Sequence, residues 1–366
     1  MPLLEICVQL QLPPVKTYSD DVLYNWALKV PSAEPIPALD NLRALTLFTG
    51  KRDEEEFYLA SVRIELRGVD ALEIMGATMD ELFVGDDLAA RRITRYLHSL
   101  VRVIDDLARL LLAVRNGCDP DTFYHEIRPW LNGADSGSRR WIFEGLDAHP
   151  ELPVPTELSG PSAAQSSLIH ALDAFLGVNH TPNPVPTPSS PSSLTSPSTS
   201  QFGTTFPQTQ TPANAYASEV ACSSHVPPKV PFLTRMRAYM PHHHQNFLRH
   251  LSSVPRPLRA EVARMGDATL TEAYNAALDA LRRFRDAHLR IVALYIVGPS
   301  HRPPTCTPVS QAKAAAERYE GQIDMGTGVT ATATGLLRGT GGTDLVKFLK
   351  GVRDHTSEAA LGRDAP

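Results

Sequence analysis

Hydrophobic positions along most of this chain recur at three- and four-residue steps, the spacing that places them on one face of a helix. This periodicity predicts helices over residues 3–11, 18–29, 54–75, 88–116, 162–177, 232–252, 257–264, 269–297 and 343–353. The alternation of apolar and polar residues that marks a β-strand is almost absent. The pattern therefore predicts an all-α protein.

Two of these segments have apolar stripes long enough to form the centre of a helical bundle. The stripe of 88–116 is the broader one, and a stripe of that width suits a helix with neighbours on several sides. In the segment 269–297 the stripe includes His288, and Arg285 precedes it by one helical turn. Taken alone, His288 is more simply explained as a core histidine bonded to a backbone carbonyl than as a ligand.

Two long connections interrupt the helical pattern. Residues 180–228 are mostly proline, serine, threonine and small polar residues with a single charged side chain, so we predict a disordered insertion there. Residues 299–342 form the second connection, which ends in a glycine-rich run. That run lacks the GK[ST] ending of a phosphate loop, which disfavours nucleotide binding. It is instead typical of a cap for the next helix, or of a lid that brings Thr340 to a ligand.

The composition excludes several classes of protein. With 366 residues, 42% of them apolar and 20% charged, the chain is typical of soluble globular proteins. A net charge of −5 disfavours nucleic acid or an anionic membrane as the main partner. No CxxC pair, no run of eighteen apolar residues and no secretory leader is found, so we expect a cytoplasmic monomer without disulfides or a zinc site.

Three groups of polar residues are candidates for metal or anion binding. Three consecutive histidines, His242 to His244, cannot converge on one ion because neighbouring helix positions point about 100° apart. His125 and Glu126 lack the second histidine of an HExxH zinc site. Arg128 lies among aromatic and apolar residues and needs an anionic partner, which is either a structural carboxylate or the carboxylate of a substrate.

Small polar residues begin the predicted helix 162–177. Ser162 with Gln165 three residues later matches a capping box, whereas the small side chains of this stretch would also admit a flat ligand. No nucleophile elbow is present, so hydrolase chemistry has little support.

The chain resembles the indoleamine 2,3-dioxygenase family, and several separate motifs in the family's order carry the resemblance. They are Leu12-Pro13-Pro14 with Tyr18 and Asn25-Trp26, Phe57-Tyr58-Leu59-Ala60-Ser61, Phe123–Leu131, Ser162–Gly177, Tyr239-Met240-Pro241 with Asn246-Phe247-Leu248, Arg285–Ile296 and Gly339–Leu349. The resemblance implies the large helical domain of the family's haem fold. It also implies haem b as cofactor, and L-tryptophan or a related indoleamine and O₂ as partners.

The resemblance also implies a role for each matching residue. The resemblance makes His288 the proximal ligand of the haem iron, Arg285 the arginine that faces a haem propionate, and Asp173 the acid that holds this arginine. Ser162 and Ala163 would follow the haem edge. The substrate pocket implied by the family comprises Tyr18, Val22, Phe57, Phe123, Tyr124, Arg128 and Thr340. Ser61 on the distal side and Arg128, which would bind the substrate carboxylate, are the candidate catalytic residues.

The implied reaction inserts both atoms of O₂ across the indole C2–C3 bond of L-tryptophan, giving N-formylkynurenine, the first step of tryptophan catabolism through kynurenine. A distal side without a histidine or an acid, as the motifs suggest, offers no strong proton donor and suits dioxygenation. A haem-binding sensor or carrier with lost or weak turnover, and a helical scaffold without haem, remain as alternatives.

The resemblance also gives the expected organisation and the departures from the family. We expect a helical connecting segment over 1–50, a haem dioxygenase domain formed by 51–179 and 229–356, the insertion between them, and a tail over 357–366. The smaller N-terminal domain of family members would be missing. Tyr58 and Tyr124 replace phenylalanines of the best-known members, and Asp21 replaces a small or thiol side chain.

Overall fold

A computed structural model describes residues 2–34, 37–86, 88–136, 141–180, 230–302, 339 and 344–362. Contacts divide the chain into one unit, Met1–His180 with Pro231–Pro366, and a second unit, Thr181–Val230. All elements named below belong to the first unit. Apart from His180, the predicted insertion lies outside the described residues, and so do Thr340 and most of the connection 299–342.

The described residues are mainly helical, which confirms the predicted all-α class. The longer helices are α1 (Pro2–Leu10), α2 (Arg52–Val84), α3 (Ala89–Ala113), α5 (Ser167–Leu176), α7 (His242–Ser252), α8 (Leu258–Met265), α9 (Ala268–Val292) and α12 (Leu345–Glu358). Shorter helical segments are η1 (Ser19–Leu23), η2 (Val114–Asn116), α4 (Pro120–Thr122), η3 (Phe123–Ile127), η4 (Arg128–Leu131), η7 (Ala163–Gln165), α6 (Phe232–Met236), η8 (Arg237–Tyr239), η9 (Ala293–Val297) and α10 (Gly298–Ser300).

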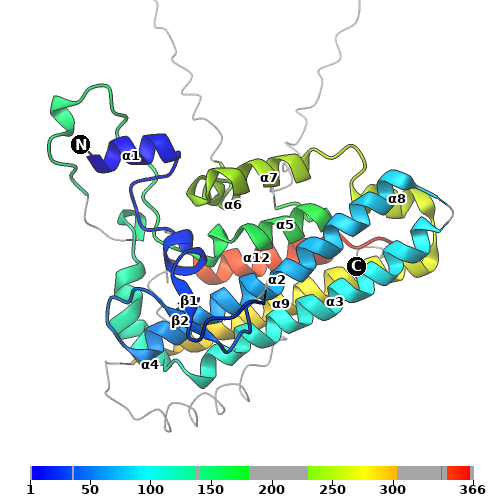
Figure 1. The fold of residues 1–366 in the computed structure, drawn as a ribbon, viewed down its shortest axis with the longest axis horizontal. Coiled ribbons are helices and arrows are strands. Elements are labelled where there is room, and N and C mark those ends of the chain that lie inside the picture. The colour runs from blue at the N-terminus through cyan, green and yellow to red at the C-terminus, as the bar shows by residue number, and fades with distance from the viewer. Residues whose placement is uncertain are drawn as a thin grey trace, which may run out of the picture. The chain divides into compact units, whose positions relative to one another are not determined.

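Three long helices, α2, α3 and α9, lie side by side and form the centre of the fold (Figure 1). The apolar stripe of α3 packs against both neighbours, and its buried members are Ile93, Leu97, Leu100, Ile104 and Leu107. Helix α12 packs against α9. Gly68 allows α5 to approach α2 closely, because a Cβ atom there would lie 2.2 Å from Leu168 Cδ2.

The prediction of a helix over 18–29 is wrong beyond its first turn. After η1 the chain forms strand β1 (Trp26–Leu28), which pairs antiparallel with β2 (Leu42–Ala44). The side chain of Asn25 fixes this arrangement, since its Nδ2 donates to Thr46 O at 2.9 Å and its Oδ1 accepts from Thr46 N at 2.8 Å. A pairing partner about twenty residues away is invisible to local periodicity, which explains the error.

Two other predicted helices are interrupted. The segment 162–177 consists of the short turn η7 followed by α5, whose N-cap is Ser166. The segment 232–252 breaks at Met240, which is extended because the next residue is Pro241. The segment 88–116 agrees with α3 and its final turn η2, and 269–297 agrees with α9 and the π-helical turn η9.

Candidate functional site

His288 lies in the last third of α9, between two parts of the core. Phe284, one turn earlier, belongs to the core of the long helices, and Val292, one turn later, belongs to a second cluster that includes Phe123 and Tyr295. A residue four positions away on a helix shares the same face. His288 therefore faces the junction between the two clusters.

The environment of His288 favours a neutral imidazole. Its side chain is half-buried, and burial together with the nearby Arg285 cation lowers the pKa of His288 to about 4. Within the described part of the chain, the ring makes no hydrogen bond. A neutral ring nitrogen with no protein partner is what an imidazole ligand of a metal requires.

Arg285 is buried and held by groups from two other helices. Its Nη2 donates to Asp173 of α5, and its Nη1 donates to Thr356 of α12. Asp173 also accepts from His180 Nε2 at 2.9 Å. Arg285 and the His180 hydrogen bond stabilise the carboxylate, so the pKa of Asp173 is lowered although burial alone would raise it. The expected contact between Arg285 and Asp173 is thus present.

Aromatic rings from three elements meet beside this region. The ring centroids of Phe57 in α2 and Phe123 in η3 are 4.5 Å apart, and Tyr295 of η9 meets Phe123 edge-on at 5.6 Å. The Tyr295 hydroxyl donates to Cys118 O at 2.6 Å, which fixes this ring. The structure therefore brings the two predicted phenylalanines together and adds Tyr295, which the sequence analysis did not assign.

Arg128 stands at the start of η4 with its guanidinium over the ring of Tyr124, 5.3 Å from the centroid. Its side chain is half-buried, and burial lowers the pKa of Arg128. A guanidinium that lies over an aromatic face still directs N–H groups away from the ring, and such groups can bind an anion. Tyr124 and Arg128 thus form one unit of the site.

Tyr18 and Val22 belong to the segment around η1, and Ser61 belongs to α2. Tyr18 and Val22 are buried in a cluster with Leu59 and Val62 of α2. The Tyr18 hydroxyl donates to Glu65 Oε1 at 2.9 Å.

A network of hydroxyl groups surrounds the Tyr18 phenol. The Ser61 hydroxyl lies near the Tyr18 phenol, and the Ser166 hydroxyl donates to the same Glu65 oxygen at 2.6 Å. Glu65 thus places a carboxyl group beside Tyr18 and one helical turn from Ser61, while the expectation of a distal side without an acid stays a prediction.

Ser162 and Ala163 keep accessible surface, and their backbone follows η7. The Ser162 hydroxyl accepts from Ala164 N at 3.2 Å, so Ser162 is an N-cap, but of η7 only. The capping-box interpretation of Gln165 is wrong. Its amide instead accepts from Tyr18 N at 2.8 Å and donates to Gly160 O at 2.9 Å, which joins the N-terminal segment to this loop.

Other candidates of the sequence analysis do not form a site. His242 and His243 are exposed, and His244 Nδ1 lies 2.9 Å from Ser167 Oγ. Glu126 pairs with Lys51 on the surface. In the part of the chain that the structure describes, no three histidine, cysteine or acidic side chains are placed to hold a metal ion. Thr340 lies outside the described residues, so its role stays a prediction.

Comparisons of the sequence with known proteins identify its family. The sequence pattern described as indoleamine 2,3-dioxygenase matches residues 1–359. The indoleamine 2,3-dioxygenase of Saccharomyces cerevisiae is 32% identical, over 98% of this chain and 71% of the yeast protein. The chain belongs to the indoleamine 2,3-dioxygenase family.

Two further members of the indoleamine 2,3-dioxygenase family show a similar likeness. Indoleamine 2,3-dioxygenase 1 of Mus musculus is 30% identical, over 99% of this chain and 72% of the mouse protein. A 6-hydroxytryptophan 2,3-dioxygenase of Fusarium equiseti is 28% identical, over 98% of this chain and 73% of the fungal one. The relatives' names support a 2,3-dioxygenase function on tryptophan or another indole.

Membership of the indoleamine 2,3-dioxygenase family makes this protein an oxidoreductase of the haem dioxygenase class. Its mostly helical structure agrees with the family fold. No described helix is long and apolar enough to cross a lipid bilayer.

Three residues that contact the predicted site residues were not identified from the sequence. Glu65 could have been found, since it follows Ser61 by four residues and therefore lies on the same face of α2. Thr356 and His180 carry no such signal. They reach Arg285 and Asp173 only through the packing of α12 and α5 around α9.

Proposed function

We propose that this protein holds haem b through His288 and converts L-tryptophan and O₂ to N-formylkynurenine. The observation that carries the proposal is the neutral imidazole of His288. It is half-buried, without a hydrogen bond to any described residue, and one helical turn from the buried Arg285. Core histidines usually find a protein partner for a ring nitrogen, so a ligand explains His288 better than packing does.

The residues around His288 fit this cofactor. Arg285 retains further N–H groups besides those bound to Asp173 and Thr356, and one turn of helix is about the distance from an iron axis to the porphyrin edge. Ser162 and Ala163 keep accessible surface, which suits contact with the rim of a flat molecule. When bound, ferrous haem supplies O₂ binding and the oxidation of the indole.

The protein itself supplies orientation. The rings of Phe57 and Phe123 offer apolar walls for an indole, and Tyr18 and Val22 close the opposite side. Arg128 binds the substrate carboxylate with two parallel hydrogen bonds, and Tyr124 holds the guanidinium in place. Ser61 presents its hydroxyl on the distal side, near the Tyr18 phenol.

The first test is His288→Ala, with His250→Ala as the matched control because His250 lies exposed on α7. Wild-type protein reconstituted with haem should show a Soret band that His288→Ala weakens or shifts, because the axial ligand is lost. The control should leave the band unchanged. An identical band in all three proteins would refute haem ligation by His288.

Product analysis then separates an enzyme from a haem carrier. Ferrous, haem-loaded wild-type protein with L-tryptophan and O₂ should form N-formylkynurenine. A normal Soret band without product would favour the sensor or carrier.

Arg128→Ala tests the substrate site. Loss of a charge-assisted pair should weaken tryptophan binding by about 1.5–3 kcal/mol and leave the haem spectrum intact. Titration of the Soret band with tryptophan measures the change, and Arg290→Ala, at an exposed position of α9, is the control. Loss of haem in Arg128→Ala would identify a structural role instead.

A further inference from the structure

A half-buried carboxyl group on α2 has no role in the proposed reaction so far. Glu65 lies one turn beyond Ser61, and its Oε1 accepts from the Tyr18 hydroxyl at 2.9 Å and from the Ser166 hydroxyl at 2.6 Å. No ion pair of Glu65 occurs among the described residues. Partial removal from water without a nearby cation disfavours the charged carboxylate, so the two hydroxyl donors are its main stabilising contacts.

Glu65 and its two partners, Tyr18 and Ser166, lie on three separate segments that each carry residues of the proposed site. Tyr18 follows the N-terminal segment and begins η1, Ser61 and Glu65 belong to α2, and Ser166 caps α5 just after η7. Gln165, next to Ser166, binds Tyr18 N at 2.8 Å. The carboxyl group therefore stands where the predicted indole wall, the distal serine and the predicted haem-edge loop meet.

We propose that Glu65 is a positioning residue of the oxygenation site, whose carboxyl oxygen fixes the Tyr18 phenol and the Ser166 hydroxyl beside the predicted distal residue Ser61. The inference rests on the proposed function, since it assigns Tyr18 to the indole wall and Ser61 to the distal side. Glu65 itself touches neither substrate nor cofactor in this assignment. It acts by holding two other side chains in one orientation.

The electrostatics agree with a carboxyl group that keeps its proton longer than usual. Burial raises the pKa of Glu65, and the two hydroxyl donors offset only part of this effect. Tyr18 is the titratable group that faces Glu65 from η1, and Ser166 faces it from α5. Burial and the Glu65 carboxyl raise the pKa of Tyr18 well above its usual value, so the phenol keeps the proton that it donates.

The test compares Glu65→Gln, which keeps an oxygen acceptor, with Glu65→Leu, which removes it at similar volume. Glu73→Leu is the control, because Glu73 lies exposed on the same helix. In Glu65→Leu the KM for L-tryptophan should rise about tenfold with an unchanged Soret band, the scale of a lost hydrogen bond between neighbouring groups. Glu65→Gln should stay within about twofold of the wild type.

A second readout does not depend on turnover. In apoprotein labelled with ¹³C at the tyrosine Cζ, the Tyr18 resonance is identified by its loss in Tyr18→Phe. It should move in Glu65→Leu and stay nearly unchanged in Glu65→Gln and Glu73→Leu. If wild-type protein forms no product, the proposed function fails while this resonance still reports on the contact.

Two results would overturn the inference. One is a Tyr18 resonance or a KM that Glu65→Leu leaves unchanged. The other is a Glu65→Gln variant as damaged as Glu65→Leu, because the acceptor is present in the former. Should Glu65→Leu fail to fold, Tyr18→Phe takes its place, and a KM equal to that of the wild type would contradict a positioning role for the Glu65–Tyr18 contact.

Discussion

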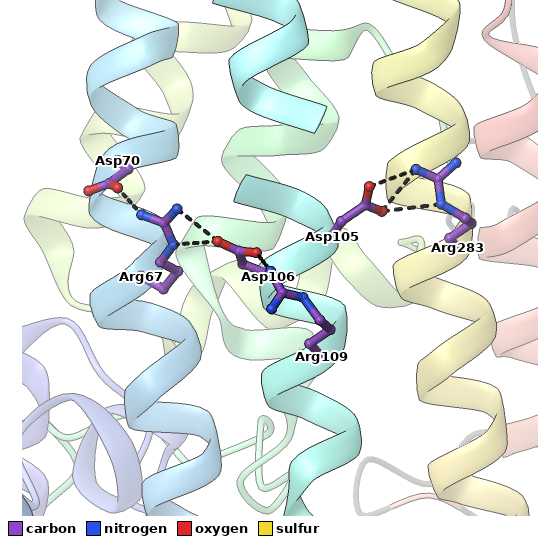
Figure 2. A network of polar contacts seen from close by, with 6 residues as sticks. All are labelled: Arg67, Asp70, Asp105, Asp106, Arg109 and Arg283. Atoms are coloured by element: carbon purple, nitrogen blue, oxygen red, sulfur yellow. Dashed lines mark hydrogen bonds and ion pairs between the residues drawn. The ribbon is translucent and has the colours of Figure 1, made fainter. Parts of the chain in front are cut away.

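Two arginines only two positions apart on α9 have opposite environments. Arg283 points outward and binds Asp105 of α3 through two nitrogens, at 2.8 to 3.2 Å, with both side chains more than 40% exposed (Figure 2). Arg285 points inward to Asp173, and these side chains are only 7% and 10% exposed. Two positions correspond to about 200° around a helix, so this short segment places one arginine in solvent and the other in the core.

The outer pair belongs to a larger surface pattern. Arg67 of α2 meets Asp106 of α3 at 2.8 Å, and Asp106 also binds Arg109 (Figure 2). These contacts join the three long helices at their surface. Water and salt screen each of them, so they are worth little individually.

The buried pair of Arg285 and Asp173 contributes to stability in a different way. Removing two charges from water costs about as much free energy as their attraction returns, yet one charge left without the other is strongly destabilising. The pair thus contributes little net stability while it fixes where Arg285 stands beside His288. The exposed and buried pairs have similar distances, so the cost of breaking an ion pair follows its burial and not its distance.

The largest expected effect is that of Arg285→Ala. It should lower the free energy of unfolding by about 3–5 kcal/mol, because Asp173 would be left as a buried charge with only His180 beside it. Urea unfolding of the apoprotein measures this loss. The double variant Arg285→Met with Asp173→Leu should recover most of it, and a double variant as unstable as Arg285→Ala would contradict the explanation.

Asp21→Asn should have an effect of intermediate size, seen in how stability depends on pH. Asp21 is buried and lies 3.0 Å from Lys16, and burial raises the pKa of Asp21 from 3.8 to about 6. Between these values the unfolded chain has lost a proton that the folded chain still holds, so stability falls as the pH rises from about 4 to about 6. The fall should be at most about 3 kcal/mol and should be much smaller in Asp21→Asn.

Unfolding curves of both proteins at several pH values measure this difference. Asp40→Asn, which lies in an exposed loop, is the control and should follow the wild type. Equal slopes for wild type and Asp21→Asn would show that Lys16 already keeps the carboxylate charged throughout this range.

The smallest effect is expected for Arg283→Ala. Loss of the exposed pair with Asp105 should change the free energy of unfolding by less than about 1 kcal/mol, and added salt should reduce the difference further. Unfolding at low and high ionic strength checks this. A loss as large as that of Arg285→Ala would mean that the surface network, rather than burial, sets the value of an ion pair.

Part of the site was predictable because its residues are close in sequence. His288 and Arg285 share one helix, so their spacing alone places them on neighbouring positions of one face. Arg128 and Tyr124 are four residues apart, and their stacking follows from that spacing. The resemblance to the family, and not periodicity, supplied the link between Arg285 and Asp173, which are 112 residues apart.

The sequence by itself determined the long helices, since apolar residues at helical spacing define a buried stripe whatever its partner is. Tertiary structure alone decided that Gln165 binds Tyr18 instead of capping a helix, that residues 26–28 form a strand, and that Glu65 meets the phenol of Tyr18. Each of these depends on a partner far along the chain. Local propensities differ by less than about 1 kcal/mol per residue, so one distant hydrogen bond is enough to override them.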